Sequence, residues 1–376
     1  MYQQSFAELG VSRAVAAALR DRGVHTPFPI QELVIADVLA GRDVLAKSPT
    51  GSGKTLAFGV PLVDLIAPGA KRPAALILAP TRELAGQIVD ELRTLARVRN
   101  LSVAAVYGGV GFEKQTRDAQ RAHILVATPG RLEDLLQRRA FSLGNVQTLV
   151  LDEADRMLDM GFRPAVDRIV AQCPRERQTL FFSATLDGEA GRIAKAYTHD
   201  PVRHEYAPPE RRPVDIDHRF MPVEHEQKLR VLVGELDDSD MAIVFVRTKR
   251  GADRLVKRLA REGVKAVAMH GDKSQGQRER ALAAFERGDV DTLVATDVAA
   301  RGIDVSGISH VINYDPPADR DGYVHRVGRT ARAGASGVGI TFFGPEHARD
   351  VKKLEAEFGI RRDERRGELR AELTSR

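Results

Sequence analysis

Short apolar runs alternate with longer amphipathic segments along almost the whole chain. In the first half, strands are predicted at Val44–Ala46, Ala75–Ala79, Ile124–Ala127, Val146–Leu151 and Thr179–Phe182, and helices at Lys54–Ile66, Arg82–Arg97 and Arg131–Arg138. In the second half, strands are predicted at Ala242–Val246, Ala266–Met269, Thr292–Ala295, His310–Asn313 and Val338–Phe342, and helices at Arg250–Glu262 and Gln275–Arg287. This alternation is typical of α/β folds in which helices cover both faces of a parallel sheet.

The chain is long enough for two such domains. Its 376 residues exceed one ordinary core, because domains usually have about 100–200 residues. Prolines and charges without an apolar period begin at Ala207 and predict an exposed linker. We therefore predict an α/β fold of two parallel-sheet domains, 1–206 and 214–362, joined by a short linker, 207–213, and followed by a charged tail, 363–376.

The net charge and the cysteine content indicate which partners and which cellular location suit this chain. The net charge is +5, and this mild basic excess suits a polyanionic partner without identifying one. Cys173 is the only cysteine, which excludes an intrachain disulfide and favours a reduced, cytoplasmic location. The first residues lack a signal-peptide pattern. No apolar run reaches the roughly 18 residues that a membrane span needs, so no membrane partner is expected.

A glycine-rich segment follows the first predicted strand and opens a helix. Backbone N–H groups of such a loop turn toward phosphate oxygens, and the helix N-terminus adds positive potential. Lys54 is placed to reach the β- and γ-phosphates, and the Thr55 hydroxyl is placed to bind Mg²⁺. The candidate phosphate-binding residues are Thr50, Gly51, Ser52, Gly53, Lys54 and Thr55.

Three carboxylates end the strand predicted at Val146–Leu151. Asp152 is a candidate Mg²⁺ ligand, since Mg²⁺ takes few carboxylates and keeps several waters. Glu153 is placed to orient and deprotonate an attacking water. Together with the glycine-rich loop, these residues predict a site for Mg²⁺ and a nucleoside triphosphate, the kind of site that binds ATP. Ser183 and Thr185 follow another strand, and their hydroxyls could cap the next helix or bond Asp155 and report the nucleotide state.

Arginines recur every three residues in the second half, at Arg326, Arg329 and Arg332. On a helix they would share one face, which could be a solvated basic surface. The alternative is that the second half brings one of these arginines to the γ-phosphate of a bound nucleotide. An arginine in that place raises the rate of hydrolysis by roughly 10³–10⁵. Asp304 could contact the ribose or could be a turn carboxylate.

Taken together, these motifs make the chain resemble the DEAD-box ATP-dependent RNA helicases over about Phe6 to Ile360. The family's adenine-reading segment is similar to Gly23–Gln31, with Phe6 upstream. The resemblance implies that Gln31 reads the adenine edge and that Phe6 stacks on the base. The family usually has an aromatic residue where this chain has Val24, which predicts weaker base packing. His325, Arg326, Asp155, Ser183 and Thr185 are implied to couple the two domains.

The same resemblance implies RNA as the partner. Two RecA-like domains would close on ATP and single-stranded RNA, contact mainly sugar and phosphate, and open short duplexes locally. The implied RNA contacts in the first domain are Pro80, Thr81, Arg82, Gly108, Gly109, Thr128, Pro129, Gly130 and Arg131. Those in the second domain are Arg247, Thr248, Gly271 and Thr296.

Three other functions are compatible with parts of this pattern. A related DNA helicase stays open, because only contacts to 2′-hydroxyls separate RNA from DNA. A catalytically silent RNA clamp or scaffold is disfavoured, since Lys54, Glu153 and Arg329 are all present. A small-molecule P-loop kinase or transporter ATPase would not explain the second half and its arginines.

Overall fold

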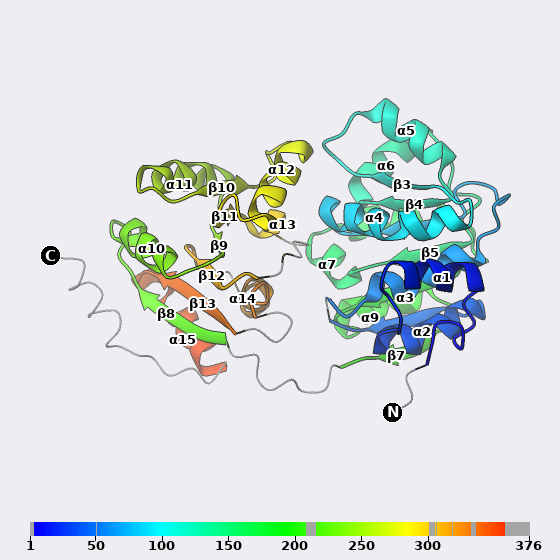
Figure 1. The fold of residues 1–376 in the computed structure, drawn as a ribbon, viewed down its shortest axis with the longest axis horizontal. Coiled ribbons are helices and arrows are strands. Elements are labelled where there is room, and N and C mark those ends of the chain that lie inside the picture. The colour runs from blue at the N-terminus through cyan, green and yellow to red at the C-terminus, as the bar shows by residue number, and fades with distance from the viewer. Residues whose placement is uncertain are drawn as a thin grey trace. The chain divides into compact units, whose positions relative to one another are not determined.

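The chain forms two compact units, Met1–Pro209 and Glu210–Arg376. The computed structural model describes residues 4–49, 51–207, 216–300, 305, 307–317, 319–331 and 336–357 (Figure 1). Except for Ala207, the predicted linker lies outside the described residues, as does the whole predicted tail. None of the described helices has the length and apolar character that a membrane span requires.

The first unit contains a seven-stranded sheet in the order β3-β4-β2-β5-β6-β1-β7, and every pairing in it is parallel. Its strands are β1 Val44–Lys47, β2 Ala75–Leu78, β3 Val103–Val106, β4 Ile124–Ala127, β5 Thr148–Leu151, β6 Gln178–Ser183 and β7 Val202–Glu205. Its helices are α1 Arg13–Asp21, α2 Pro29–Leu39, α3 Lys54–Leu65, α4 Arg82–Val98, α5 Phe112–Arg121, α6 Pro129–Gln137, α7 Ala154–Asp159, α8 Arg163–Val170 and α9 Gly188–Tyr197.

Side chains of the central strands alternate between two apolar cores. Along β2, Ala75 and Ile77 pack with residues of α1 to α4 on one face. Leu76 and Leu78 pack with residues of α6 to α9 on the other face. This alternation follows from the two-residue period of a strand. The sheet is therefore covered on both sides, as parallel sheets require.

The second unit contains a six-stranded parallel sheet in the order β10-β11-β9-β12-β13-β8. Its strands are β8 Ile216–Pro222, β9 Ala242–Phe245, β10 Ala266–Met269, β11 Thr292–Ala295, β12 His310–Asn313 and β13 Gly337–Phe343. Its helices are α10 Lys228–Asp237, α11 Lys249–Arg261, α12 Gln275–Glu286, α13 Asp297–Ala300, α14 Arg320–Val327, the 3₁₀ helix η1 Pro345–His347 and α15 Ala348–Glu357. Again two cores form, with α10 and α11 on one face and α12 to α15 on the other.

The carboxyl ends of parallel strands meet at one edge of each sheet, where α/β proteins bind ligands. In the first unit this edge carries the segments that follow β1, β2, β4, β5 and β6, and all five contain predicted site residues. The two parallel sheets confirm the predicted fold class. Strands β3, β7 and β8 were not predicted: β3 and β7 are the two edge strands of the first sheet, and β8 is one of the two edge strands of the second.

Candidate functional site

The phosphate-binding loop joins β1 to α3 through glycines in the left-handed region. Gly51 and Gly53 have φ of 77° and 86°, and Gly53 caps the N-terminus of α3. Lys54 is buried, and its Nζ donates to the carbonyl oxygen of Ser48 at 3.2 Å. The lysine ammonium is therefore held over the loop, beside a helix N-terminus that offers N–H groups to an anion. Thr55 follows within the first turn of α3, whereas Thr50 lies outside the described residues.

Gln31 is tied to this loop by its side-chain amide. Its Oε1 accepts from the backbone N–H of Phe28 at 2.9 Å, and its Nε2 donates to the carbonyl oxygen of Gly53 at 2.9 Å. An amide has two N–H groups and two acceptor lone pairs. After these two bonds, one of each remains, which is the donor and acceptor pair that an adenine edge needs.

Phe6 lies in an environment that differs from the predicted one. Its side chain is only 3% exposed and belongs to the core cluster between the sheet and α1 to α4. A ring enclosed by apolar side chains does not present a face to a nucleotide base. The structure encloses the Phe6 ring among apolar side chains, and its stacking on adenine stays a prediction.

The carboxylates follow β5 directly. Asp152 is 2% exposed, and burial raises its pKa to about 6, against the opposing charge of Lys54. The neighbouring Glu153 carboxylate raises this pKa further. Lys54 begins α3 after β1 and Asp152 follows β5, so both residues lie at the carboxyl edge of the first sheet. The structure thus brings together two of the predicted catalytic groups.

Glu153 forms a buried ion pair that was not predicted. Its Oε2 accepts from Nη1 of Arg156 at 2.5 Å, and both side chains are 8% exposed. Glu153 itself has a φ of 49°, an uncommon conformation for a residue with a side chain. The spacing of three residues at the start of α7 was the available sequence signal, since such residues are neighbours on a helix.

Asp155 contacts the segment after β6, although through the main chain. Its Oδ2 accepts from the backbone N–H of Ala184 at 3.0 Å. The hydroxyls of Ser183 and Thr185 instead accept from the N–H groups of Thr185 and Asp187, at 3.4 and 3.2 Å. The Asp155 side chain is therefore linked to the segment after β6 by a peptide N–H group, while the two hydroxyls accept bonds within their own turn.

The predicted RNA contacts of the first unit gather beside β2, β3 and β4. A side-chain carbon added to Gly108 would lie 2.9 Å from Nη2 of Arg82, so Arg82 lies directly over this glycine. Arg131 donates to the carbonyl oxygen of Val110 at 3.1 Å and lies 4.0 Å above the ring of Phe112. Burial and the charge of Arg82 both lower the pKa of Arg131.

The other predicted members of this set occupy the same turns. Thr81 caps α4, because its Oγ1 accepts from the N–H of Leu84 at 3.2 Å. Thr128 precedes α6 without a side-chain capping bond. Pro80 follows β2 and Gly109 follows β3, whereas Pro129 and Gly130 are the first residues of α6. The first unit thus presents one cluster of hydroxyls, glycines and arginines, the kinds of group that contact a nucleic-acid backbone.

The second unit places its predicted RNA contacts at the corresponding sheet edge. Arg247 follows β9, and its N–H donates to Oδ2 of Asp315 at 2.8 Å. Thr248 caps α11 by accepting from the N–H of Gly251 at 3.0 Å. Gly271 and Thr296 follow β10 and β11. These segments therefore share one edge, as their places in the sequence predict.

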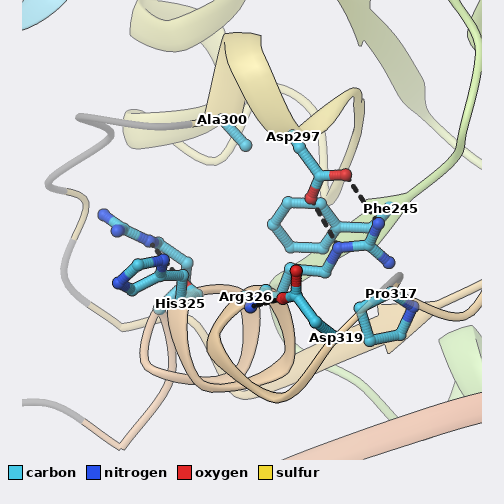
Figure 2. Close-up of a pocket in the computed structure, with 9 residues that line it drawn as sticks. Phe245, Asp297, Ala300, Pro317, Asp319, His325 and Arg326 are labelled. Carbon is cyan, nitrogen blue, oxygen red and sulfur yellow. Dashed lines mark hydrogen bonds and ion pairs between the residues drawn. The ribbon is translucent and has the colours of Figure 1, made fainter. Parts of the chain in front are cut away.

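Arg326 is anchored inside the second unit. It donates to both carboxylate oxygens of Asp297, at 2.5 and 2.7 Å, and to Oδ1 of Asn313 and the carbonyl oxygen of Asp315. Its guanidinium lies 5.0 Å from the ring centre of Phe245. Figure 2 shows Arg326 facing Asp297 beside this ring. Arg326 therefore joins α14 to α13 and to the end of β12.

Arg329 does not share a helix face with Arg326, because α14 ends at Val327. Its Nε donates to the carbonyl oxygen of His325 at 3.2 Å, and its side chain is 7% exposed. Both residues line a cavity of about 110 Å³ with His325 and Asp319. The reading as a solvated basic surface is wrong for Arg326 and Arg329, which are buried. Arg332 and Asp304 lie outside the described residues.

Comparison with known families matches both units. Residues 28–193 match the DEAD/DEAH box helicase family, and residues 224–334 match the helicase conserved C-terminal domain. The ATP-dependent RNA helicase CshA of Limosilactobacillus reuteri is 42% identical over 93% of this chain and 71% of its own length. The DEAD-box ATP-dependent RNA helicase CshA of Geobacillus kaustophilus is 41% identical over 93% of this chain and 76% of its own length.

Solved structures agree. Saccharomyces cerevisiae Dbp5 bound to RNA and ADP-BeF3 superimposes with a TM-score of 0.82 and 30% identity, over 94% of this chain and 93% of that one. A DEAD box protein from Methanococcus jannaschii has a TM-score of 0.54 and 36% identity, over 96% of this chain and 98% of that one. These matches extend over both sheets and all the motifs described above. The chain belongs to the DEAD-box ATP-dependent RNA helicases.

Proposed function

We propose that this protein hydrolyses ATP when it is bound to RNA and uses the resulting closure of its two units to open short duplexes or remodel RNA–protein complexes. The observation that carries the proposal is the placement of two buried residues, Lys54 and Asp152, with Glu153 beside them, at the carboxyl edge of one parallel sheet. A loop lysine, a metal-binding carboxylate and a candidate general base are the parts that triphosphate hydrolysis needs.

The residues present suit Mg²⁺ bound with ATP. The ion prefers oxygen ligands and uses few protein carboxylates. Among the described residues no group of three or more His, Cys, Asp or Glu could hold a metal by itself. The Thr55 hydroxyl and the buried Asp152 would therefore hold Mg²⁺ together with phosphate oxygens and water. Bound there, the ion supplies charge neutralisation at the phosphates.

Within this scheme the first unit binds and aligns the nucleotide. Gly51, Ser52, Gly53 and Lys54 hold the phosphates, and Gln31 reads the base through its remaining N–H and lone pair. Glu153 orients the attacking water and takes its proton. Thr50 belongs to the same loop and is proposed to contribute its N–H group.

The second unit supplies the groups that complete the reaction. We assign the γ-phosphate contact to Arg329 and Arg332, and the ribose contact to Asp304. Arg326 anchors α14 to Asp297 and Asn313, and the carbonyl oxygen of His325 accepts from Nε of Arg329. We propose that both residues couple this helix to the closure. Negative charge develops on the γ-phosphate in the transition state, and an arginine that is already oriented toward it stabilises this charge.

RNA is the proposed nucleic-acid partner. Dbp5, with which the chain shares its fold, was solved with RNA bound. The strand-end glycines, threonines and arginines of both units suit phosphate and sugar rather than base edges, so weak sequence preference is expected. We infer a cytoplasmic location, where RNA and ATP are available and where a lone cysteine such as Cys173 stays reduced.

The test is ATP hydrolysis measured without nucleic acid, with single-stranded RNA and with single-stranded DNA of the same length and sequence. We expect RNA to stimulate turnover strongly and DNA to stimulate it less. Lys54→Ala serves as the control that removes the phosphate contact. Equal stimulation by DNA would overturn the RNA assignment, and turnover that ignores both polymers would overturn the proposed coupling.

A further inference from the structure

Phe28 is an apolar aromatic residue on the surface of the first unit. Its side chain is 59% exposed, more than any other large hydrophobic side chain among the described residues. The others in that group are aliphatic: Leu33, Leu65, Val98 and Val324. Phe28 therefore leaves an unusually large apolar surface in contact with water.

This ring lies against the phosphate-binding loop. A side-chain carbon added to Gly53 would lie 2.6 Å from Cδ2 of Phe28 and 2.7 Å from Nε2 of Gln31. The backbone N–H of Phe28 also donates to Oε1 of Gln31. The ring, the base-reading amide and the loop that holds the phosphates are thus in direct contact.

The two other candidates for packing on the base do not provide an aromatic face. Phe6 is 3% exposed within the core. Val24 is partly buried against the same core and has no ring. A base held at Gln31 therefore meets one exposed aromatic side chain in the described part of the unit, that of Phe28.

We propose that Phe28 stacks on the adenine base and contributes to ATP affinity, a role for which the sequence pointed to Phe6. The inference rests on the proposed ATPase function. Flat aromatic rings stack on nucleobases because every base offers a π-face, and one such contact is worth roughly tenfold or more in affinity. Stacking does not distinguish bases, so Phe28 sets affinity whereas Gln31 sets the preference for adenine.

The experiment compares Phe28→Ala, Phe28→Tyr and Leu33→Ala in the full chain. Leu33 lies on the same helix and is 40% exposed, so it controls for the loss of any exposed apolar side chain. The KM for ATP is measured at saturating RNA, and tripolyphosphate, which has no base, is measured as a competitor. We expect Phe28→Ala to raise the KM for ATP about tenfold with little change in kcat and in tripolyphosphate inhibition. Phe28→Tyr and Leu33→Ala should stay near the wild type.

Three results would overturn the inference. An unchanged KM for ATP in Phe28→Ala would show that the ring does not touch the base. If Phe28→Ala weakened the binding of ATP and of tripolyphosphate equally, Phe28 would act by supporting the loop at Gly53. A rise in KM for Leu33→Ala as large as that for Phe28→Ala would assign the effect to general surface packing. If the wild type itself does not hydrolyse ATP with RNA, the proposed function fails before the role of Phe28 is reached.

Discussion

The side-chain amide nitrogen of Gln31 donates a 2.9 Å hydrogen bond to the carbonyl oxygen of Gly53, the residue that caps α3. One buried amide thus connects the base-reading segment to the phosphate loop. Because Gln31 is 1% exposed, its orientation is fixed by this bond and by the N–H of Phe28. Changes at this residue should therefore affect both base selection and the loop.

Gln31→Ala should lower the preference for ATP over GTP. Loss of a two-point contact with adenine should cost about 1–3 kcal/mol, by analogy with side-chain readout of adenine in DNA. The lost bond to Gly53 should in addition weaken binding of both nucleotides. Competition between ATP and GTP measures the first effect, and the affinity for tripolyphosphate measures the second. Unchanged selectivity would restrict Gln31 to holding the loop.

Glu153→Gln should nearly abolish hydrolysis while ATP still binds. The amide keeps an oxygen that can accept from Arg156, but it does not take a proton from water. Arg156→Ala should lower stability more, because removing one partner of a buried ion pair leaves the other charge unpaired, at a cost of about 3–5 kcal/mol. Single-turnover hydrolysis and urea unfolding separate the two effects. Wild-type turnover in Glu153→Gln would remove this residue from the mechanism.

Arg326→Ala and Arg329→Ala should fail for different reasons. Loss of Arg326 leaves Asp297, whose side chain is 40% exposed, without its bidentate partner. Because solvent can partly reach Asp297, we expect a loss of about 2–3 kcal/mol in unfolding free energy, less than for a fully buried pair. Arg329→Ala should cut RNA-stimulated hydrolysis by about a thousandfold or more with normal ATP binding. The same loss of stability in both variants would argue against separate roles.

Asp152→Asn should stabilise the Mg²⁺-free protein at neutral pH. Burial raises the pKa of Asp152 to about 6 from an ordinary value of 3.8, so the folded state holds this proton more tightly than the unfolded state. The folded state of the wild type is therefore most stable at low pH, and this stability is lost as the pH rises through about 6. At pH 7 the variant should gain up to about 3 kcal/mol, and the gain should shrink at pH 5. Urea unfolding with EDTA at both pH values checks this, and a gain independent of pH would contradict it.

Cys173 should be unreactive until the first unit unfolds. Its side chain is 7% exposed, and burial raises the pKa of its thiol to about 11. At pH 8 the reactive thiolate is therefore scarce, and labelling by a disulfide reagent should be slower than for a free thiol by on the order of a hundredfold. Labelling rates measured across a urea titration should follow unfolding of the first unit. Rapid labelling of the native protein would show that local opening exposes α8 and the turn after it.

The central strands could be predicted from sequence because they are buried on both faces. β2 and β4 are continuous apolar runs with every residue buried. The edge strands β7 and β8 could not, since β7 alternates between partly buried and exposed residues, and β8 is only partly buried along its length, whereas the edge strand β10 was predicted. Hydrogen bonding to one neighbour alone defines such strands, and no continuous apolar run marks them in the sequence.

The site shows a similar division. Positions that follow buried strands, such as Lys54 and Asp152, could be located from motif spacing. The surroundings of a side chain could not be predicted in the same way. The enclosure of Phe6 and the exposure of Phe28 depend on packing between elements that are distant in sequence, whereas the pairing of Glu153 with Arg156 had a local signal in their spacing. The end of α14 at Val327 also separated Arg329 from the face predicted by a three-residue repeat.

The peptide bond between Ser183 and Ala184 makes the contact from the β6 turn to Asp155 with an atom that every amino acid except proline carries. Alanine scanning of this turn therefore does not remove the bond to Asp155. Replacing Ser183 or Thr185 tests only the hydrogen bonds that their hydroxyls form within the turn. A comparison of Ala184→Gly, which keeps the N–H group, with Ala184→Pro, which removes it, would test whether this bond is needed. The contact therefore depends on the main chain, and proline is the one replacement at position 184 that removes its donor.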